Sequence, residues 1–230
     1  MEFAEVSFGW GNTPPLIENF SLVVPTGKIT ILVGISGCGK STLLRLAAGL
    51  LNPVAGQIHG NDCERSFVFQ APNLLPWRTV AENVSLPLAL NNTPRAKQPS
   101  LVTQALQRVG LAEHAYKLPR ELSGGMQMRV SLARGLVTNP DILLMDEPFG
   151  ALDAHTRRRI QDEFLRLWER SRMTVLMVTH DLEEAAWLGD QVVALGRTPL
   201  SVMGIIERPA SRSRRDPDVP TVVEKLEAWL

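Results

Sequence analysis

The sequence predicts an α/β fold with a mainly parallel β-sheet. Short apolar runs rich in β-branched residues, typical of strands buried on both faces, recur along the chain. Segments with the spacing of amphipathic helices lie between these runs, and a glycine-rich turn joins one run directly to a helix. Strands that alternate with helices favour a parallel sheet, because two parallel neighbours must be joined by a long crossover connection.

Each predicted strand is a continuous apolar segment. The first precedes the glycine-rich turn and a helix over 41–48, and the third ends in an acid. Lengths of three to six residues suit strands rather than helices. The predicted strands are 28–33, 67–69, 141–146, 175–179 and 191–195.

Residues 71–122 have a different character and predict an inserted helical subdomain of about 72–137. Prolines break this part of the chain into short helices; they stand at positions 72, 76, 87, 94, 99 and 119. One helix there is indicated by Leu101, Ala105, Arg108 and Val109. A later helix opens at Ser123 and is predicted to carry Val130, Ala133, Leu136 and Val137 on one face.

The C-terminal part of the chain contains two further helical patterns. Ile160, Phe164, Leu167 and Trp168 follow the spacing of an amphipathic helix. Residues 207–230 are predicted to form a solvated, arginine-rich linker and a short terminal helix marked by Val222, Leu226 and Trp229. With 230 residues and no internal repeat, we expect one domain over 1–230.

Composition narrows the partners and the compartment. Lys and Arg together number 24, as do Asp and Glu, so there is no electrostatic case for a nucleic acid partner. Two cysteines do not form a secreted disulfide framework, and Met1–Trp10 lacks a signal-peptide pattern, which favours the cytoplasm. No run of 18 apolar residues is present, so any membrane role is expected to come through a partner.

The glycine-rich turn, Gly34-Ile-Ser-Gly-Cys-Gly-Lys-Ser41, matches G-x-x-x-x-G-K-[ST]. Glycines let backbone N–H groups face a phosphate, and the positive end of the following helix favours the same anion. Lysine then reaches the β- and γ-phosphates of ATP and the serine hydroxyl binds Mg²⁺. Chance would give such a match about once in a hundred chains, before the flanking strand and helix are considered. The nucleotide-binding candidates are Gly34, Ser36, Gly37, Cys38, Gly39, Lys40, Ser41 and Thr42.

An acid pair follows the third predicted strand. Asp146 ends that strand and Glu147 comes next. The carboxyl ends of parallel strands border the ligand crevice of an α/β sheet, so Asp146 could hold Mg²⁺ and Glu147 could act as general base on water. The alternative is a solvated strand end, which a neighbouring phosphate loop makes the weaker interpretation.

Further motifs resemble those of the ABC ATPases, in the order found in that family and over nearly the whole chain. Leu122-Ser-Gly-Gly-Met-Gln-Met-Arg129 resembles the signature motif, about twenty residues before Asp146. Gln70 resembles the Q-loop glutamine, which would also contact Mg²⁺, and His180 the switch histidine. Asp153 in Ala-Leu-Asp resembles the D-loop, and Trp10 falls where the family stacks an aromatic ring on adenine.

Each of these residues also has an ordinary structural interpretation. Gln70 and His180 could be polar residues at strand ends, and Asp153 could simply cap the next helix. Trp10 could instead be a core aromatic. Its match to the adenine-stacking position is loose, because the family usually has tyrosine there. Cys38 is interpreted as a small filler of the phosphate loop, where the family often has cysteine, and not as a nucleophile.

Ser123, Gly124 and Gly125 open a predicted helix and make a second anion site without a lysine. The resemblance implies that two copies of the chain join head to tail, so that the signature of one closes over ATP held by the other. It also implies Glu147 as base, assisted by His180 and Gln70.

The resemblance extends to the importer branch that serves nitrate, sulfonate and taurine. Residues 74–84 resemble a segment of that branch that helps to receive a permease, and residues 147–157 and 207–217 also resemble it. The implied partners are membrane permease subunits and, indirectly, an external solute-binding protein, with this chain peripheral at the cytoplasmic face of the inner membrane. The resemblance also implies a RecA-like P-loop NTPase core with a small antiparallel β lobe, which the short 59–66 segment is expected to trim. The solute is left open, as are the effects of Met128 and of that short segment. The alternatives are a soluble ABC ATPase with a non-transport partner and a non-hydrolysing cassette.

Overall fold

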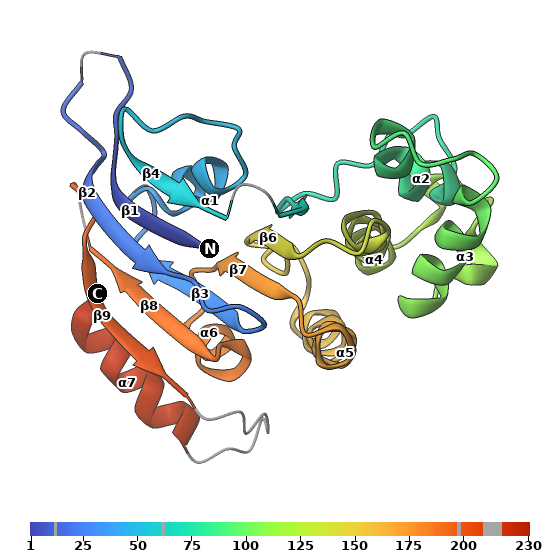
Figure 1. Cartoon of the computed structure of the whole chain (residues 1–230). Coiled ribbons are helices and arrows are strands. Elements are labelled where there is room, and N and C mark those ends of the chain that lie inside the picture. The colour runs from blue at the N-terminus through green and yellow to red at the C-terminus, as the bar shows by residue number, and fades with distance from the viewer. Residues whose placement is uncertain (12, 61–62, 197–198, 209–217) are drawn as a thin grey trace.

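The structure is a computed structural model that describes residues 1–11, 13–60, 63–196, 199–208 and 218–230. It confirms an α/β fold with a mainly parallel sheet, a smaller antiparallel sheet and a group of helices to one side (Figure 1).

The central sheet has the strand order β5-β6-β7-β3-β8-β9, in which β9 alone is antiparallel to its neighbour. Parallel strands bring their carboxyl ends to one edge, which gathers Gly34, Asp146 and Val178. All five predicted strands are confirmed within two residues at each end. The strands are β3 Ile29–Gly34, β5 Arg65–Val68, β6 Ile142–Asp146, β7 Thr174–Val178, β8 Gln191–Leu195 and β9 Val202–Glu207.

The smaller sheet is antiparallel and has the order β2-β1-β4. Its strands are β1 Glu2–Phe8, β2 Ile17–Val23 and β4 Ala55–His59. Gly56 has a positive φ of 79°, and a Cβ there would overlap the backbone of Glu5, which explains a glycine in this strand. Within the described chain, which omits residues 61–62, this antiparallel sheet consists of three paired strands beside the short 59–66 segment.

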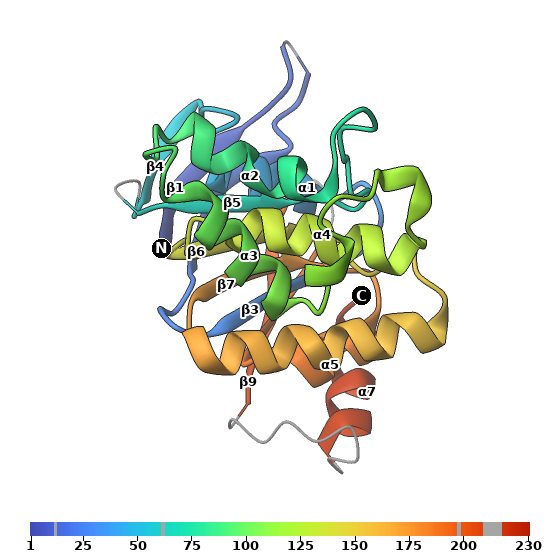
Figure 2. The ribbon, with the colours of Figure 1, turned by 90° about the vertical axis from the view of Figure 1, so that its right-hand side faces the viewer.

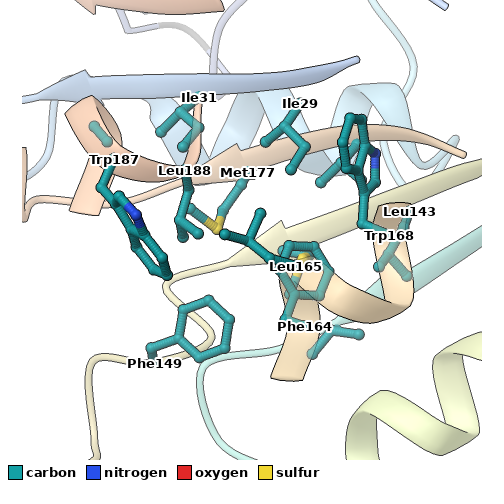
Figure 3. Close-up of a cluster of buried hydrophobic side chains, with 14 of the residues drawn as sticks. Ile29, Ile31, Leu143, Phe149, Phe164, Leu165, Trp168, Met177, Trp187 and Leu188 are labelled. Carbon is teal, nitrogen blue, oxygen red and sulfur yellow. The ribbon is translucent and has the colours of Figure 1, made fainter. Parts of the chain in front are cut away.

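Side chains alternate between the two faces of the central sheet, as the period of a β-strand requires. Ile29, Ile31 and Val33 of β3 enter one apolar cluster, and Leu32 enters another. The first cluster packs under helices α5 Ala154–Ser171 and α6 Leu182–Leu188 (Figure 3), and α7 Asp218–Trp229 contributes Val222 and Leu226 to it. The second packs against α1 Lys40–Ala47 and the antiparallel sheet. The phosphate loop therefore leaves a strand that is fixed from both sides.

Helices α2 Val80–Leu90, α3 Gln98–Arg108 and α4 Gly124–Leu136 gather beside the sheet around a third apolar cluster (Figure 2). They lie within 72–137, where the sequence predicts a helical subdomain. A reciprocal capping box fixes the start of α2: Thr79 accepts from the Glu82 amide, and the Glu82 carboxylate accepts from the Thr79 amide.

Helix α4 corrects one prediction. Val130, Ala133 and Val137 pack into the helical cluster, whereas Leu136 lies with Leu132 in the cluster under the sheet. The single apolar face expected for Val130, Ala133, Leu136 and Val137 is therefore wrong. The helix is buried on two sides because it stands between two layers.

The C-terminal part also differs in detail from the expected linker. Strand β9 extends to Glu207, and residues 209–217 of the predicted linker lie outside the described chain. The predicted terminal helix is confirmed as α7, with Val222 and Leu226 buried. Trp229 covers Gly204 of β9 so closely that a Cβ on that glycine would stand 2.5 Å from the indole ring.

Candidate nucleotide-binding and catalytic site

The phosphate loop joins β3 to α1, and the local structure explains why glycine stands at three of its positions. A Cβ on Gly34 would stand 2.6 Å from the Leu195 carbonyl oxygen of β8. Gly37 and Gly39 have φ values of 81° and 115°, in the left-handed region that favours glycine. Among the described residues no side chain caps α1, whose N-cap is Gly39, so the first N–H groups of the helix have no side-chain acceptor. This geometry suits an anion at the helix start.

Lys40 is buried and folds across the loop that precedes it. Its Nζ donates to the carbonyl oxygens of Gly34, at 2.6 Å, and Ile35, at 2.9 Å. An ammonium group has three donors, so one remains for a phosphate oxygen. The loop thus holds a positive charge at the place where phosphate charge would lie.

The remaining loop candidates divide between solvent and core. Ser36 and Gly37 are exposed, whereas Cys38 and Thr42 are buried. Cys38 belongs to the apolar cluster around α1, and its Sγ would be 3.2 Å from a Cβ on Gly34. Its position fits a small filler inside the loop.

Ser41 and Asp146 are joined across 105 residues of sequence. The Ser41 hydroxyl donates to Asp146 Oδ1 over 2.8 Å. Burial raises the pKa of Asp146, an effect that the Ser41 hydrogen bond opposes and the neighbouring Glu147 charge increases. A hydroxyl and a carboxylate oxygen are ligands that Mg²⁺ accepts, and its positive charge would offset the burial of Asp146. The pair therefore fits a divalent cation that is also bound by nucleotide phosphates.

Glu147 is the point on which two other predicted residues converge. Its Oε2 lies 3.0 Å from His180 Nδ1 and accepts from Gln70 Nε2 at 3.4 Å. Its backbone has a φ of 44°, and its N–H donates to the Val178 carbonyl of β7. This left-handed conformation is uncommon for a glutamate and turns the side chain beyond the end of β6. The arrangement can orient a water molecule and take a proton from it.

Ser123, Gly124 and Gly125 lie apart from this group, at the start of α4. The Ser123 hydroxyl caps the helix by accepting from the Met126 amide. A Cβ on Gly124 would meet no atom of the described chain within 4 Å, whereas one on Gly125 would stand 2.5 Å from Thr156 Cγ2 in α5. Among the described residues, no hydrogen bond links this helix start to the phosphate loop. Ser123 and Gly124 are exposed, so this helix start is open to solvent.

Asp153 and Trp10 are the outlying candidates. Asp153 caps α5 by accepting from the Thr156 amide, and this hydrogen bond lowers the pKa of its exposed carboxyl. Trp10 is half exposed and packs edge-on against Phe8, with ring centroids 5.0 Å apart. Leu16, six residues later, lies against Gly39, so this N-terminal segment borders the phosphate loop.

Sequence reasoning assigned no role to Arg157, which the structure places between two parts of the site. Its guanidinium contacts Asp181, next to His180, and the carbonyls of the turn after Glu147. The available signal was its position one helical turn after Asp153, where a long side chain can reach back over the helix start. A separate cavity of about 770 Å³ lies at the other end of the strands, beside Ile142 and Thr174, and none of the predicted site residues lines it.

Comparison with known proteins places this geometry among related chains. Residues 17–150 match a family model described as ABC transporter. An aliphatic sulfonates import ATP-binding protein of Pseudomonas savastanoi pv. phaseolicola is 43% identical over 209 residues, which cover 90% of this chain and 85% of that protein. A nitrate import ATP-binding protein of Synechococcus elongatus is 42% identical over 210 residues, covering 86% and 76%.

Two further similarities extend the picture. A bicarbonate transport ATP-binding protein of Synechococcus elongatus is 43% identical over 219 residues, which cover 91% of this chain and 33% of that longer protein. A solved dimeric ATP-binding cassette, described as a post-hydrolysis state bound to ADP and Pi, superposes with a TM-score of 0.77 at 30% identity. The superposition covers 91% of this chain and 99% of that one.

Proposed function

Because the chain belongs to the ABC transporter family and is an ATPase of that family, we propose that it energises the import of a small anionic solute. Sulfonate, nitrate and bicarbonate are the solutes in the names of its relatives, and taurine belongs to the same chemical class. The observation that carries the catalytic part is the convergence of Gln70 and His180 on Glu147, beside the Ser41–Asp146 pair.

The proposed reaction is the attack of water on the γ-phosphate of ATP. Glu147 Oε2 takes a proton from the water as its oxygen bonds to phosphorus, and the bond between the γ-phosphorus and the bridging oxygen breaks to release ADP. His180 fixes the Glu147 carboxylate through the 3.0 Å contact. Lys40 and the amides at the start of α1 stabilise the phosphate charge.

Mg²⁺ is part of this proposal, with Ser41, Asp146 and Gln70 as the residues that would hold it directly or through water. When bound, the ion neutralises charge on the β- and γ-phosphates. Trp10 is proposed to stack on adenine, which its half-exposed ring allows.

The site is proposed to be completed by a second copy of the chain. Packing within the chain accounts for Gly125 but leaves space at Gly124 unfilled. An exposed helix start with free N–H groups suits the phosphate of ATP bound to another copy. The dimeric cassette at 30% identity supports the same arrangement, and exposed Asp153 would lie near the junction.

The permease is proposed to dock beside the helical subdomain. A groove of about 360 Å³ runs between this subdomain and β5, with apolar walls formed by Phe67, Phe69, Leu86, Pro87 and Leu90. Trp77, in the segment before α2, exposes 72% of its surface. Exposed apolar patches of this kind suit the amphipathic coupling helix of a partner.

Within the described residues, no helix is long and apolar enough to cross a membrane. We propose a peripheral position at the cytoplasmic face of the inner membrane, where permease subunits would hold the chain, because its relatives are ATP-binding proteins of import systems. An external solute-binding protein would join the complex on the other side of the membrane.

The test is affinity purification of the tagged chain from solubilised native membranes, with co-purifying chains identified by mass. We expect a multispanning permease and ATPase activity in the complex. Addition of the companion solute-binding protein with sulfonate, nitrate or bicarbonate should stimulate that activity for one solute class. Recovery of a ribosomal or DNA-repair partner without a permease would instead support a soluble ABC ATPase and overturn the transport proposal.

A further inference from the structure

Arg157 connects two loops that approach the catalytic site from different strands. It lies in the first turn of α5, four residues after the helix cap Asp153. Its Nη1 forms an ion pair with Asp181 Oδ2 at 3.2 Å. Its Nη2 donates to the carbonyl oxygens of Leu152, at 3.1 Å, and Gly150, at 3.5 Å. One side chain thus contacts the segment after β6 and the segment after β7.

On the β7 side, the ion pair bears on the loop that carries His180. Asp181 follows His180 and caps α6, because its Oδ1 accepts from the Glu184 amide. Its own N–H donates to Thr179 Oγ1. The backbone on both sides of His180 is therefore fixed, and Arg157 holds the remaining oxygen of Asp181.

On the β6 side, Arg157 bears on the turn that follows Glu147. The Gly150 amide donates to the Glu147 carbonyl at 3.1 Å, which closes this turn. A Cβ on Gly150 would stand 3.7 Å from both Glu147 Oε2 and Gln70 Nε2, so the turn lies against the reacting groups. The contacts close a circuit from Glu147 through Gly150, Arg157 and Asp181 to His180, which returns to Glu147.

We propose that Arg157 is a positioning residue that sets His180 against Glu147 and links this pair to the D-loop. The proposal rests on the catalytic roles proposed for Glu147 and His180. Arginine suits the task because its planar fork carries several donors in fixed directions, whereas lysine carries one flexible charge. The Leu152 carbonyl directly precedes Asp153, so a shift of the D-loop on dimer closure is transmitted to the His180 loop through one guanidinium.

A purely structural role makes a different prediction. The side chains of Arg157 and Asp181 each keep 30% of their surface exposed, and ion pairs with this exposure contribute little to stability. Loss of the contact should therefore change turnover far more than folding. Substrate affinity should also persist, because Arg157 lies outside the phosphate loop.

The experiment measures kcat and KM for MgATP in Arg157→Gln and Arg157→Lys, each in the wild-type and His180→Ala backgrounds. Single-turnover hydrolysis of radiolabelled ATP follows the slow variants. In the wild-type background Arg157→Gln should lower kcat by about 10- to 100-fold, with KM changed by less than about threefold. In the His180→Ala background the same substitution should lower kcat by less than about threefold, because the positioned group is gone.

Arg166→Gln is the matched control, since it removes the same charge from an exposed site on the same helix. It should leave kcat within about twofold in both backgrounds. Asp181→Asn keeps the oxygen that caps α6 but weakens the ion pair with Arg157. The fall in kcat that it causes should therefore not add to the fall caused by Arg157→Gln. If Arg157→Gln cannot be purified folded, Arg157→Lys and Asp181→Asn test the same contact.

An equal loss from Arg157→Gln in both backgrounds would overturn the proposal, as would a raised KM with unchanged kcat. The failure of the underlying function gives a different result: wild-type turnover in His180→Ala alone would remove the proposed role of His180, whatever Arg157 does.

Discussion

Gly125 at the start of α4 lies against Thr156 at the start of α5, so closely that a Cβ on the glycine would stand 2.5 Å from Thr156 Cγ2. The neighbouring Gly124 has open space around it. Packing against Thr156 therefore explains the glycine at position 125. It does not explain the glycine at position 124, for which we propose contact with a second copy of the chain.

Alanine substitutions should separate these two reasons. Gly125→Ala should lower the free energy of unfolding by about 1–3 kcal/mol because the methyl group overlaps Thr156. Thr156→Ser removes Cγ2 and keeps the hydroxyl, so the double variant should recover most of this loss. Gly124→Ala should fold as stably as the wild type but lose ATPase activity. Thermal unfolding and phosphate release measure both effects, and a stable Gly125→Ala single variant would contradict the packing argument.

Glu147→Gln should abolish turnover while ATP binding remains. The amide retains the size and the contacts of the carboxylate but cannot accept a proton, so kcat should fall by about 10²–10⁴-fold. Bound ATP should then hold two copies together, which light scattering after size-exclusion chromatography with MgATP would detect. Turnover at the wild-type rate would remove Glu147 from the role of base.

Asp146→Asn should stabilise the nucleotide-free protein and eliminate hydrolysis. Burial raises the pKa of Asp146 above its ordinary value of 3.8, so the folded state holds the proton more tightly than the unfolded state. Below pH 3.8 the carboxyl is protonated in both states, so its ionisation costs no stability. The cost grows as the pH rises from there through the pKa of Asp146 in the folded state. The side chain is partly exposed, so we expect a gain of at most about 1 kcal/mol at pH 7, or about 2–4 °C in Tm. A lower Tm in calorimetry would contradict this reasoning.

Glu184→Gln should remove part of the pH dependence of stability. Burial is the main cause that raises the pKa of Glu184, although hydrogen bonds from Thr179 and Gln161 oppose it. The ionised carboxylate therefore lowers wild-type stability increasingly as the pH rises above 4.5 through the folded pKa.

The Tm of Glu184→Gln should equal that of the wild type at low pH and should be higher than that of the wild type near pH 7. Glu183→Gln, at an exposed position next to it, is the control and should follow the wild type at every pH. Parallel curves for Glu184→Gln and the wild type would show that burial of this carboxyl has no energetic effect.

Trp77→Glu should lose the permease without losing the fold. The indole exposes 72% of its surface, so its replacement should leave Tm unchanged. The ATPase activity of the isolated chain should stay within about 20% of wild type. A buried aromatic anchor at an interface commonly carries a large share of binding energy, so the permease should no longer co-purify. Tyr116→Ala, at an aromatic site that is 89% exposed elsewhere in the helical subdomain, should retain it. Equal recovery with both variants would place the docking surface elsewhere.

The parallel core could be predicted because its strands are continuous apolar runs, whose signal does not depend on distant residues. Strand β9 could not be predicted: its residues alternate between exposed and half-buried, and Gly204 interrupts it. That glycine makes sense only once Trp229 lies over it, 25 residues later in the chain. Leu136 of α4 was assigned to the wrong layer because the sequence pattern does not reveal that the helix has neighbours on both sides.

The site shows the same division. Lys40, Ser41, Asp146 and Glu147 lie in short motifs whose residue types and spacing carry the chemistry. The ion pair between Arg157 and Asp181 joins two helix starts 24 residues apart, and neither side chain has a local pattern that points to the other. Contacts of this kind follow from the tertiary arrangement of β6, β7 and α5, which the sequence order does not specify.

The double burial of α4 has a mechanical consequence. One side of the helix is packed with Val84 and Leu88 of α2, the other lies beneath the sheet, and its first residue follows Ser123. A displacement of α2 would therefore move α4 with it, and with α4 the helix start at Ser123 that we propose as the second anion site. In the proposed complex, force on α2 from a docked permease and phosphate contact at the Ser123 end would be mechanically coupled through α4.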